Sequence, residues 1–375
     1  MPYLHGTDVS VTAESTTKIQ QPVLTGVGAI VTADDADAIF AEGEAVLLPD
    51  FSSETLAKTG TTGTFKSVFN TLQSQGYTPQ VVVVRVAENA DEAAIVAAIE
   101  TLKTHSNHFG FDIKLIMAPG LETSTAIINK LESAAVAMGA SAKAALTMCA
   151  DYDAVVTERA KYDLKATELL WPVTHFDNGE MVHVSALAIA ARIMTDETHN
   201  IAASMSSKKL NGGIDALSMP VDHGSEDSLA NKLNAIQVST VIRRSASDFC
   251  IFGARTTSTN ENYRYEMWGR VSNLIKTMIK EGFKTYLDGT VTPEAIIASE
   301  ELIKTDTIDF VKREGLASGG FFKFNSEKTT ADTLKDGKVL YEYGFGPVPI
   351  FEQIRVEGDI MLSYMDQIIL DTQAA

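Results

Sequence analysis

Apolar residues recur at two different spacings along most of the chain. The β-branched run 81–86 is typical of a strand covered on both faces of a sheet, and the mainly apolar runs 114–117 and 144–150 also predict strands. Between these runs, 91–104 and 124–138 carry apolar residues at helical spacing. Strands that alternate with helices predict an α/β fold with a mainly parallel sheet.

The pattern changes at 204–224, where lysine, asparagine, glycine and proline predict a loop-rich boundary. Beyond it, strand patterns at 238–243 and 319–324 flank a long helical pattern at 260–287. The fold is therefore expected to be α/β (α+β overall). Its expected parts are an N-terminal linking arm at 1–20, an α/β domain at 21–230, a C-terminal α+β domain at 231–360 and a C-terminal linking arm at 361–375.

Both chain ends carry strand-like segments beyond the expected domains. Each could be an edge strand of its own subunit or an arm that pairs with a neighbouring subunit, because isolated strand edges favour pairing. A donor surface that differs from its acceptor surface can propagate into a helical polymer. The candidate arm residues are Thr7, Val9, Val11, Met361, Leu362, Ile368 and Ile369.

Composition narrows the classes of protein. The 375 residues are 45% hydrophobic and carry a net charge of −18, which excludes a mainly disordered chain and disfavours broad contact with nucleic acid. Cys149 and Cys250 lie beside apolar residues, which indicates two buried free thiols. We expect no signal peptide and no membrane insertion, because no stretch approaches the ~20 apolar residues of a membrane span.

The charge is unevenly distributed. Residues 241–290 contain eight basic and five acidic side chains, whereas the sequence on either side is acidic. With about 100° per residue, Lys276, Lys280 and Lys284 fall one turn apart on one face of the expected helix, with Arg270 beside them. The row is either a solvated lysine face or a docking face for an acidic partner.

Candidate chemistry is sparse. Gly26-Val27-Gly28 follows a strand-like segment, but Val31 occupies the place of the third glycine of a dinucleotide-binding fingerprint. His175, Asp177 and His183 have a spacing that metal ligands can have, although a surface turn explains them better. We therefore expect no cofactor and no metal. A structural protein is favoured, and the alternative is an α/β nucleotide-binding enzyme that uses the Gly26–Gly28 region.

Several short segments, in this order and spacing, resemble one family. They are His5–Val9, Val27–Ala33, Met117–Leu121, Leu233–Arg244, Phe252–Thr256, Leu340–Tyr343 and Phe351–Ile354. Together they resemble contractile tail sheath proteins of myophages and R-type pyocins, of the compact two-domain kind. The resemblance covers the whole chain and does not separate an infectious phage from a related injection particle.

The resemblance implies a function. Sheath subunits polymerise helically around an inner tube in a metastable extended state, linked by strand exchange through their terminal arms. Contraction then drives the tube through a target envelope. It implies as partners other copies of the chain, the inner tail tube protein, and baseplate and tail terminator proteins. It places the C-terminal domain, with Arg270, Lys276, Lys280 and Lys284, toward the tube and the α/β domain outward. The expected location is a virion tail or tail-like particle, assembled in the bacterial cytoplasm.

Overall fold

The computed structural model describes residues 25–105 and 108–360. The two expected linking arms, 1–20 and 361–375, lie outside the described residues. So do all seven candidate arm residues: Thr7, Val9, Val11, Met361, Leu362, Ile368 and Ile369.

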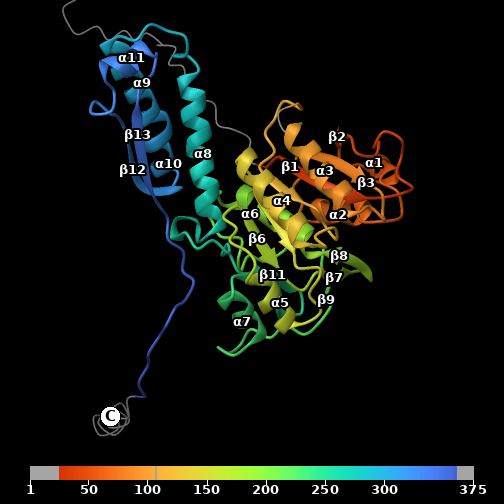
Figure 1. The fold of residues 1–375 in the computed structure, drawn as a ribbon. Coiled ribbons are helices and arrows are strands. Elements are labelled where there is room, and N and C mark those ends of the chain that lie inside the picture. The colour runs from red at the N-terminus through yellow and green to blue at the C-terminus, as the bar shows by residue number, and fades with distance from the viewer. Residues whose placement is uncertain (1–24, 106–107, 361–375) are drawn as a thin grey trace, which may run out of the picture.

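An eight-stranded sheet forms the centre of the larger part of the molecule (Figure 1). The strand order is β11-β10-β6-β5-β4-β1-β3-β2. The six inner strands run parallel, and β2 and β11 pair antiparallel at the two edges. The expected mainly parallel α/β sheet is therefore confirmed. The strands are β1 Val27–Thr32, β2 Ala45–Leu47, β3 Val81–Val86, β4 Leu115–Met117, β5 Ser141–Ala145, β6 Thr167–Leu170, β10 Val238–Ser245 and β11 Asp248–Phe252.

Helices cover both faces of this sheet, which is why its inner strands are almost entirely buried. On one face α3 Glu92–Thr104 and α4 Thr125–Met138 pack over the sheet, together with α5 Tyr152–Arg159 and α7 Leu229–Ala235. On the other face lie α2 Phe65–Ser74 and α6 Val184–Thr198, while α1 Ser53–Lys58 precedes α2 in the chain. Local signals start and stop these helices. The side chain of Ser124 caps the first turn of α4, and Gly139 ends that helix in the left-handed conformation.

A small three-stranded sheet extends the α/β unit. It consists of β7 Thr174–Asp177, β8 Glu180–His183 and β9 Ala216–Leu217. The first two strands join through Asn178-Gly179, both with positive φ, which is the conformation that a tight two-residue hairpin requires.

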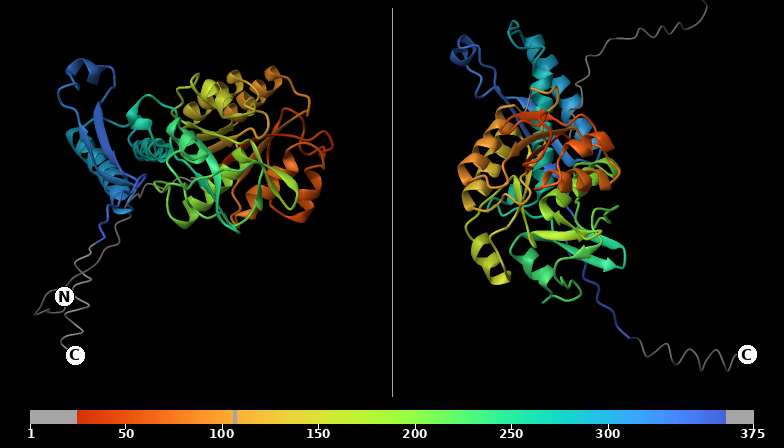
Figure 2. Two further views of the ribbon diagram at one scale, coloured as in Figure 1. Left: turned by 90° about the horizontal axis from the view of Figure 1, so that it is seen from below. Right: turned by 90° about the vertical axis from the view of Figure 1, so that its right-hand side faces the viewer.

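The C-terminal part is a separate helix-and-hairpin unit beside the α/β unit (Figure 2). In it a two-stranded antiparallel sheet packs on the long helix α8 and on the helices that follow it. The elements are η1 Glu261–Tyr263, α8 Glu266–Phe283, α9 Pro293–Ile303, η2 Lys304–Asp309, α10 Phe310–Arg313, β12 Ala317–Phe324, α11 Ala331–Lys335 and β13 Tyr341–Pro347.

The division between the two units differs from the expected boundary at 230. Strands β10 and β11 belong to the eight-stranded sheet, so this sheet continues to Phe252. The loop-rich stretch 204–224 is a connection within the α/β unit: Ser207 and Leu210 donate backbone hydrogen bonds to β11. The polar composition of 204–224 therefore indicates a surface loop and not a boundary between domains, because the chain forms two more strands of the same sheet after it.

Candidate assembly surfaces

The lysine row lies on the outer side of α8. Lys276, Lys280 and Lys284 are all exposed, and the opposite side of the helix buries Val271, Ile275 and other apolar residues. Among the described residues, only Lys284 of the three has an ion pair, with Glu281 at 2.7 Å. The row therefore presents positive charge that is largely uncompensated within the subunit.

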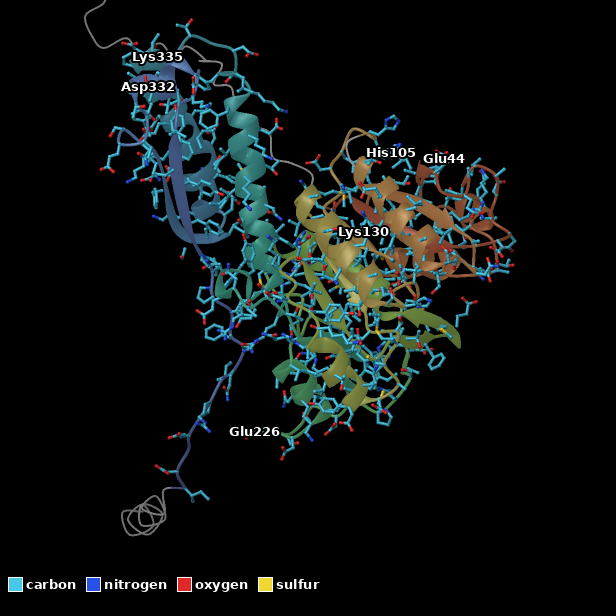
Figure 3. All side chains as sticks on the ribbon, in the orientation of Figure 1. Glu44, His105, Lys130, Glu226, Asp332 and Lys335 are labelled. Carbon is cyan, nitrogen blue, oxygen red and sulfur yellow. The ribbon has the colours of Figure 1, made fainter. Side chains whose placement is uncertain are left out.

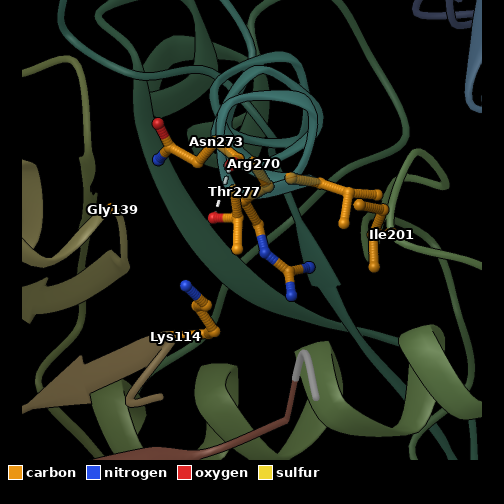
Figure 4. Close-up of a pocket in the computed structure, with 7 residues that line it drawn as sticks. Lys114, Gly139, Ile201, Arg270, Asn273 and Thr277 are labelled. Carbon is orange, nitrogen blue, oxygen red and sulfur yellow. Dashed lines mark hydrogen bonds between the residues drawn. The ribbon is translucent and has the colours of Figure 1, made fainter. Parts of the chain in front are cut away.

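Arg270 does not belong to this row. It is 7% exposed and donates to both oxygens of Asp196 on α6, at 2.8 and 2.6 Å. Arg270 borders the apolar side of α8, so it turns inward to the carboxylates of the α/β unit. Figure 4 shows its side chain extending from α8 into the space between this helix and the α/β unit.

Arg270 is part of a buried network of six charges that joins α8 to the sheet and to α6. Lys143 on β5 lies 2.5 Å from Glu168 on β6 and 3.4 Å from Glu266 on α8. Arg192 on α6 lies 2.6 Å from Asp196 and 3.6 Å from Glu266. The members are the cations Lys143, Arg192 and Arg270 and the carboxylates Glu168, Glu266 and Asp196.

Opposite charges compensate each other in this network. Burial alone would raise the pKa of Glu266, but Lys143, Arg270 and Arg192 lower it to about 2. Burial raises the pKa of Glu168 despite the neighbouring Lys143. Sequence reasoning missed the network, although it left a signal: Lys143, Glu168 and Arg192 each lie inside an otherwise apolar strand or helix.

Two small pockets flank α8 where it faces the amino-terminal ends of the parallel strands. The larger, about 70 Å³, is lined by Lys165, Lys276 and Asn273 among others. The smaller, about 10 Å³, lies beside Lys114 and Thr277 (Figure 4). The lysine row therefore continues from Lys276 to Lys165 at the junction of the two units.

The sheet of β12 and β13 is covered on one face only. Phe322 packs against the helices and stacks on Tyr341, with ring centroids 5.3 Å apart. On the other face Phe321 is 50% exposed, beneath the ammonium group of Lys323. On α9, Ile297 is 68% exposed. Within the described part of the chain, each strand pairs only with the other, so both outer edges are open.

The chain leaves this sheet as an extended, exposed segment (Figure 1). Residues 348–360 contain no helix or strand, in contrast to the alternation that the sequence shows at 350–360. Ile354, Val356 and Ile360 are 75%, 85% and 90% exposed. In an extended chain the side chains at positions 354, 356 and 360 lie on one face, so this segment presents an apolar face with no partner strand among the described residues.

The candidate chemical sites have structural explanations. Gly26 and Gly28 lie at the start of β1, whereas nucleotide loops lie at the carboxyl ends of parallel strands. A Cβ on Gly28 would lie 2.5 Å from the side chain of Leu102, so this glycine allows α3 to pack closely on the sheet. Burial raises the pKa values of the Cys149 and Cys250 thiols to about 11.

The candidate metal ligands do not converge. His175 is fully buried on β7 with no hydrogen-bond partner for either ring nitrogen, and burial lowers its pKa to about 4. Within residues 25–105 and 108–360 no three histidine, cysteine or acidic side chains gather as a metal site would require. In the same ranges no helix has the length and apolar character needed to cross a membrane.

Known proteins are similar to this chain over almost its full length. No family model matches it. It is 24% identical to the tail sheath protein of Escherichia phage P2, with 98% of each chain covered. It is also 24% identical to the major tail sheath protein of Serratia phage KSP20, with 94% of each covered.

Solved structures share the fold. The contracted helical sheath of the anti-feeding prophage matches with a TM-score of 0.73 at 15% identity, covering 96% of this chain and 99% of that one. The contracted sheath of the extracellular contractile injection system PVC gives a TM-score of 0.71 at 13% identity, covering 96% and 100%.

Full-length similarity to phage tail sheath proteins, together with a fold shared by contracted sheaths, supports a structural subunit of a contractile tail or tail-like particle. Within that class, the predicted resemblance to contractile tail sheath proteins is confirmed. The alternative prediction, a nucleotide-binding enzyme, gains no support from these relatives.

Proposed function

We propose that this sheath protein polymerises helically around an inner tube in a metastable extended state, and that its contraction drives the tube through a target envelope without catalysis. The observation that carries the proposal is the full-length similarity to phage tail sheath proteins. Similarity to chains from an anti-feeding prophage baseplate supports the baseplate as a further partner. Assembly in the bacterial cytoplasm and contact with a terminator protein belong to the same proposal.

Strand exchange links the subunits. The open edges of β12 and β13 offer unpaired backbone groups, and the extended segment at 353–360 offers a strand without a partner. Ile354, Val356 and Ile360 of one copy would extend the apolar face that Phe322 and Tyr341 form in another. The acceptor edge differs from the donor segment, so the contact propagates instead of closing into a dimer.

The C-terminal unit faces the tube and the α/β unit faces outward. Lys276, Lys280 and Lys284 carry the tube contact, and their exposed charge favours an acidic partner surface. Arg270 has a different role, since it holds α8 to the α/β unit through Asp196. The outward unit belongs to the acidic part of the chain, so neighbouring copies repel one another at low salt.

Electron microscopy of the purified chain tests the function. We expect striated tubes or rings, with more polymer at higher salt. A compact monomer or dimer under all salt conditions would contradict the proposal.

A lysine-to-glutamate triple variant tests the tube-facing surface. K276E/K280E/K284E should fold normally and form no sheath on purified tubes. A matched control, K161E/K209E/K232E, makes the same charge change at exposed lysines of the α/β unit and should still coat tubes. If both variants lost sheath formation equally, the cause would be total charge, and the proposal that the lysine row faces the tube would be contradicted.

A further inference from the structure

The C-terminal extension is the segment 348–360 that follows β13, and its first part, 348–352, contacts the body of the subunit at two points. The guanidinium of Arg255, which follows β11, donates from Nε and Nη2 to the two carboxylate oxygens of Glu352, each at 2.5 Å. The hydroxyl of Tyr265 donates to the same carboxylate at 2.8 Å. Partial burial would raise the pKa of Glu352, but these hydrogen bonds lower it below its usual value.

The second point lies four residues earlier. The indole Nε1 of Trp268 donates to the carbonyl oxygen of Val348 at 3.0 Å. Between the two points, Ile350 packs against a small apolar cluster that includes Tyr265 and Met267. Residues 348, 350 and 352 therefore each contact the body of the subunit, whereas Phe351 between them is 93% exposed and every residue of 353–360 is exposed.

These contacts bring together two segments that the sequence analysis singled out separately. Phe252–Thr256 contains Arg255 and Phe351–Ile354 contains Glu352, and the two side chains are 97 positions apart. Arg255, Tyr265 and Trp268 lie in or beside the connection from β11 to α8. The contacts thus place the first residues of the extension, 348–352, beside the connection from β11 to α8.

We propose that Arg255, Tyr265 and Trp268 are positioning residues that clamp 348–352 and so aim the strand at 353–360 toward a second copy of the chain. The inference rests on the proposed function, since the aimed strand is the one exchanged. Clamping 348–352 restricts the volume that the strand explores and raises its effective concentration at the acceptor edge. Without the clamp, the flexible connection to the strand at 353–360 would begin after Pro347 and would be five residues longer.

A charge-swap series in the full-length chain tests the clamp. The variants are R255E, E352R, the double swap R255E/E352R and the milder E352Q. In the unassembled subunit, the backbone of 350–352 should be more mobile in R255E than in wild type, as NMR order parameters measure, with partial recovery in the double swap. The protein concentration needed for polymer should rise about tenfold in R255E and fall back in the double swap.

A matched pair in the α/β unit serves as the control. Arg244 and Asp248 form an exposed ion pair at 3.0 Å in the β10–β11 hairpin, and R244E should leave the concentration needed for polymer unchanged. A chemical unfolding curve for each variant separates the loss of the clamp from a loss of folding.

Three outcomes would overturn the clamp. R255E and E352Q could polymerise at the wild-type concentration, R244E could impair assembly as much as R255E, or the loss in R255E could follow its unfolding free energy without recovery in the double swap. A wild-type chain that forms no ordered polymer would overturn the proposed function and the clamp with it. The two failures are distinguishable, because the clamp fails alone only when the wild-type chain polymerises.

Discussion

The α/β unit and the C-terminal unit differ in how much of their apolar surface is buried within one subunit. In the α/β unit, helices cover both faces of the sheet, and every residue of β1 is buried. In the C-terminal unit the sheet has two strands and one covered face, and β13 contains no buried residue. The first unit is complete within one subunit. The second leaves apolar side chains and strand edges for other molecules, which is what an assembly protein requires.

The largest effect is expected inside the buried charge network that joins the units. R192M removes the cation that lies between Asp196 and Glu266, both of which stay buried. We expect the free energy of unfolding to fall by about 3–5 kcal/mol, because the network then holds three buried carboxylates and only two cations, although Asp196 keeps Arg270 and Glu266 keeps Lys143. Urea unfolding at neutral pH measures the change.

An exposed pair provides the contrast for that experiment. Asp332 and Lys335 lie at the outer end of the C-terminal unit, with side chains 91% and 76% exposed (Figure 3). K335M should change stability by less than about 0.5 kcal/mol. Equal losses in R192M and K335M would contradict the view that the network fastens α8 to the α/β unit.

The second largest effect is a gain in the free energy of unfolding, and its size depends on pH. Glu122 is fully buried in the α/β unit with one unpartnered carboxylate oxygen, and burial raises its pKa from 4.5 to about 7. The folded state therefore holds a proton that the unfolded state releases, so stability falls as pH rises from about 4.5 to about 7. E122Q should be more stable than wild type by about 3 kcal/mol at pH 8.

That gain should be small at pH 5, where the wild-type carboxyl is still protonated in the folded state. Urea unfolding of both proteins at the two pH values measures the difference. A gain of the same size at both would show that packing, and not ionisation, distinguishes the two side chains.

The contrast between the units also explains which parts of the fold could be predicted. Strands such as β3 and helices such as α3 and α4 have strong local patterns because packing on a closed sheet imposes one period along each element. Helix α6 was not predicted, since it is buried nearly all round and therefore carries no helical stripe of polar residues. The boundary at 230 differed from the structure because loop composition does not tell whether the chain rejoins the same sheet.

An assembly surface could be predicted from the sequence only where all its residues lie on one helix or strand, so that their spacing shows that they share a face. The lysine row of α8 repeats along a single helix, so its exposure followed from spacing. Arg270 has the same periodic signal, but its orientation depends on Asp196, which lies 74 positions away. The Arg255–Glu352 contact likewise joins distant segments, and a single sequence contains no record of which residues meet.

Two strand glycines test the difference in packing on a smaller scale. In β1, a Cβ at Gly28 would meet Leu102, while a Cβ at Gly319 in β12 would meet nothing within 4 Å. G28A should therefore cost about 1–3 kcal/mol through overpacking, and G319A should be neutral or slightly stabilising. Thermal unfolding of both variants compares them. A neutral G28A would contradict the close packing of α3 on the sheet.

The smallest effect on folding should accompany a large effect on assembly. Ile297 on α9 and Ile39 in the α/β unit are 68% and 46% exposed, so glutamate at either position should change the free energy of unfolding by less than about 0.5 kcal/mol. Their effects on polymer should differ. I297E places a charge on an exposed apolar position of the C-terminal unit, and sedimentation should show a clear loss of polymer, whereas I39E should polymerise as wild type does. Equal polymer yields from I297E and I39E would mean that the exposed apolar surface of the C-terminal unit is not covered on assembly.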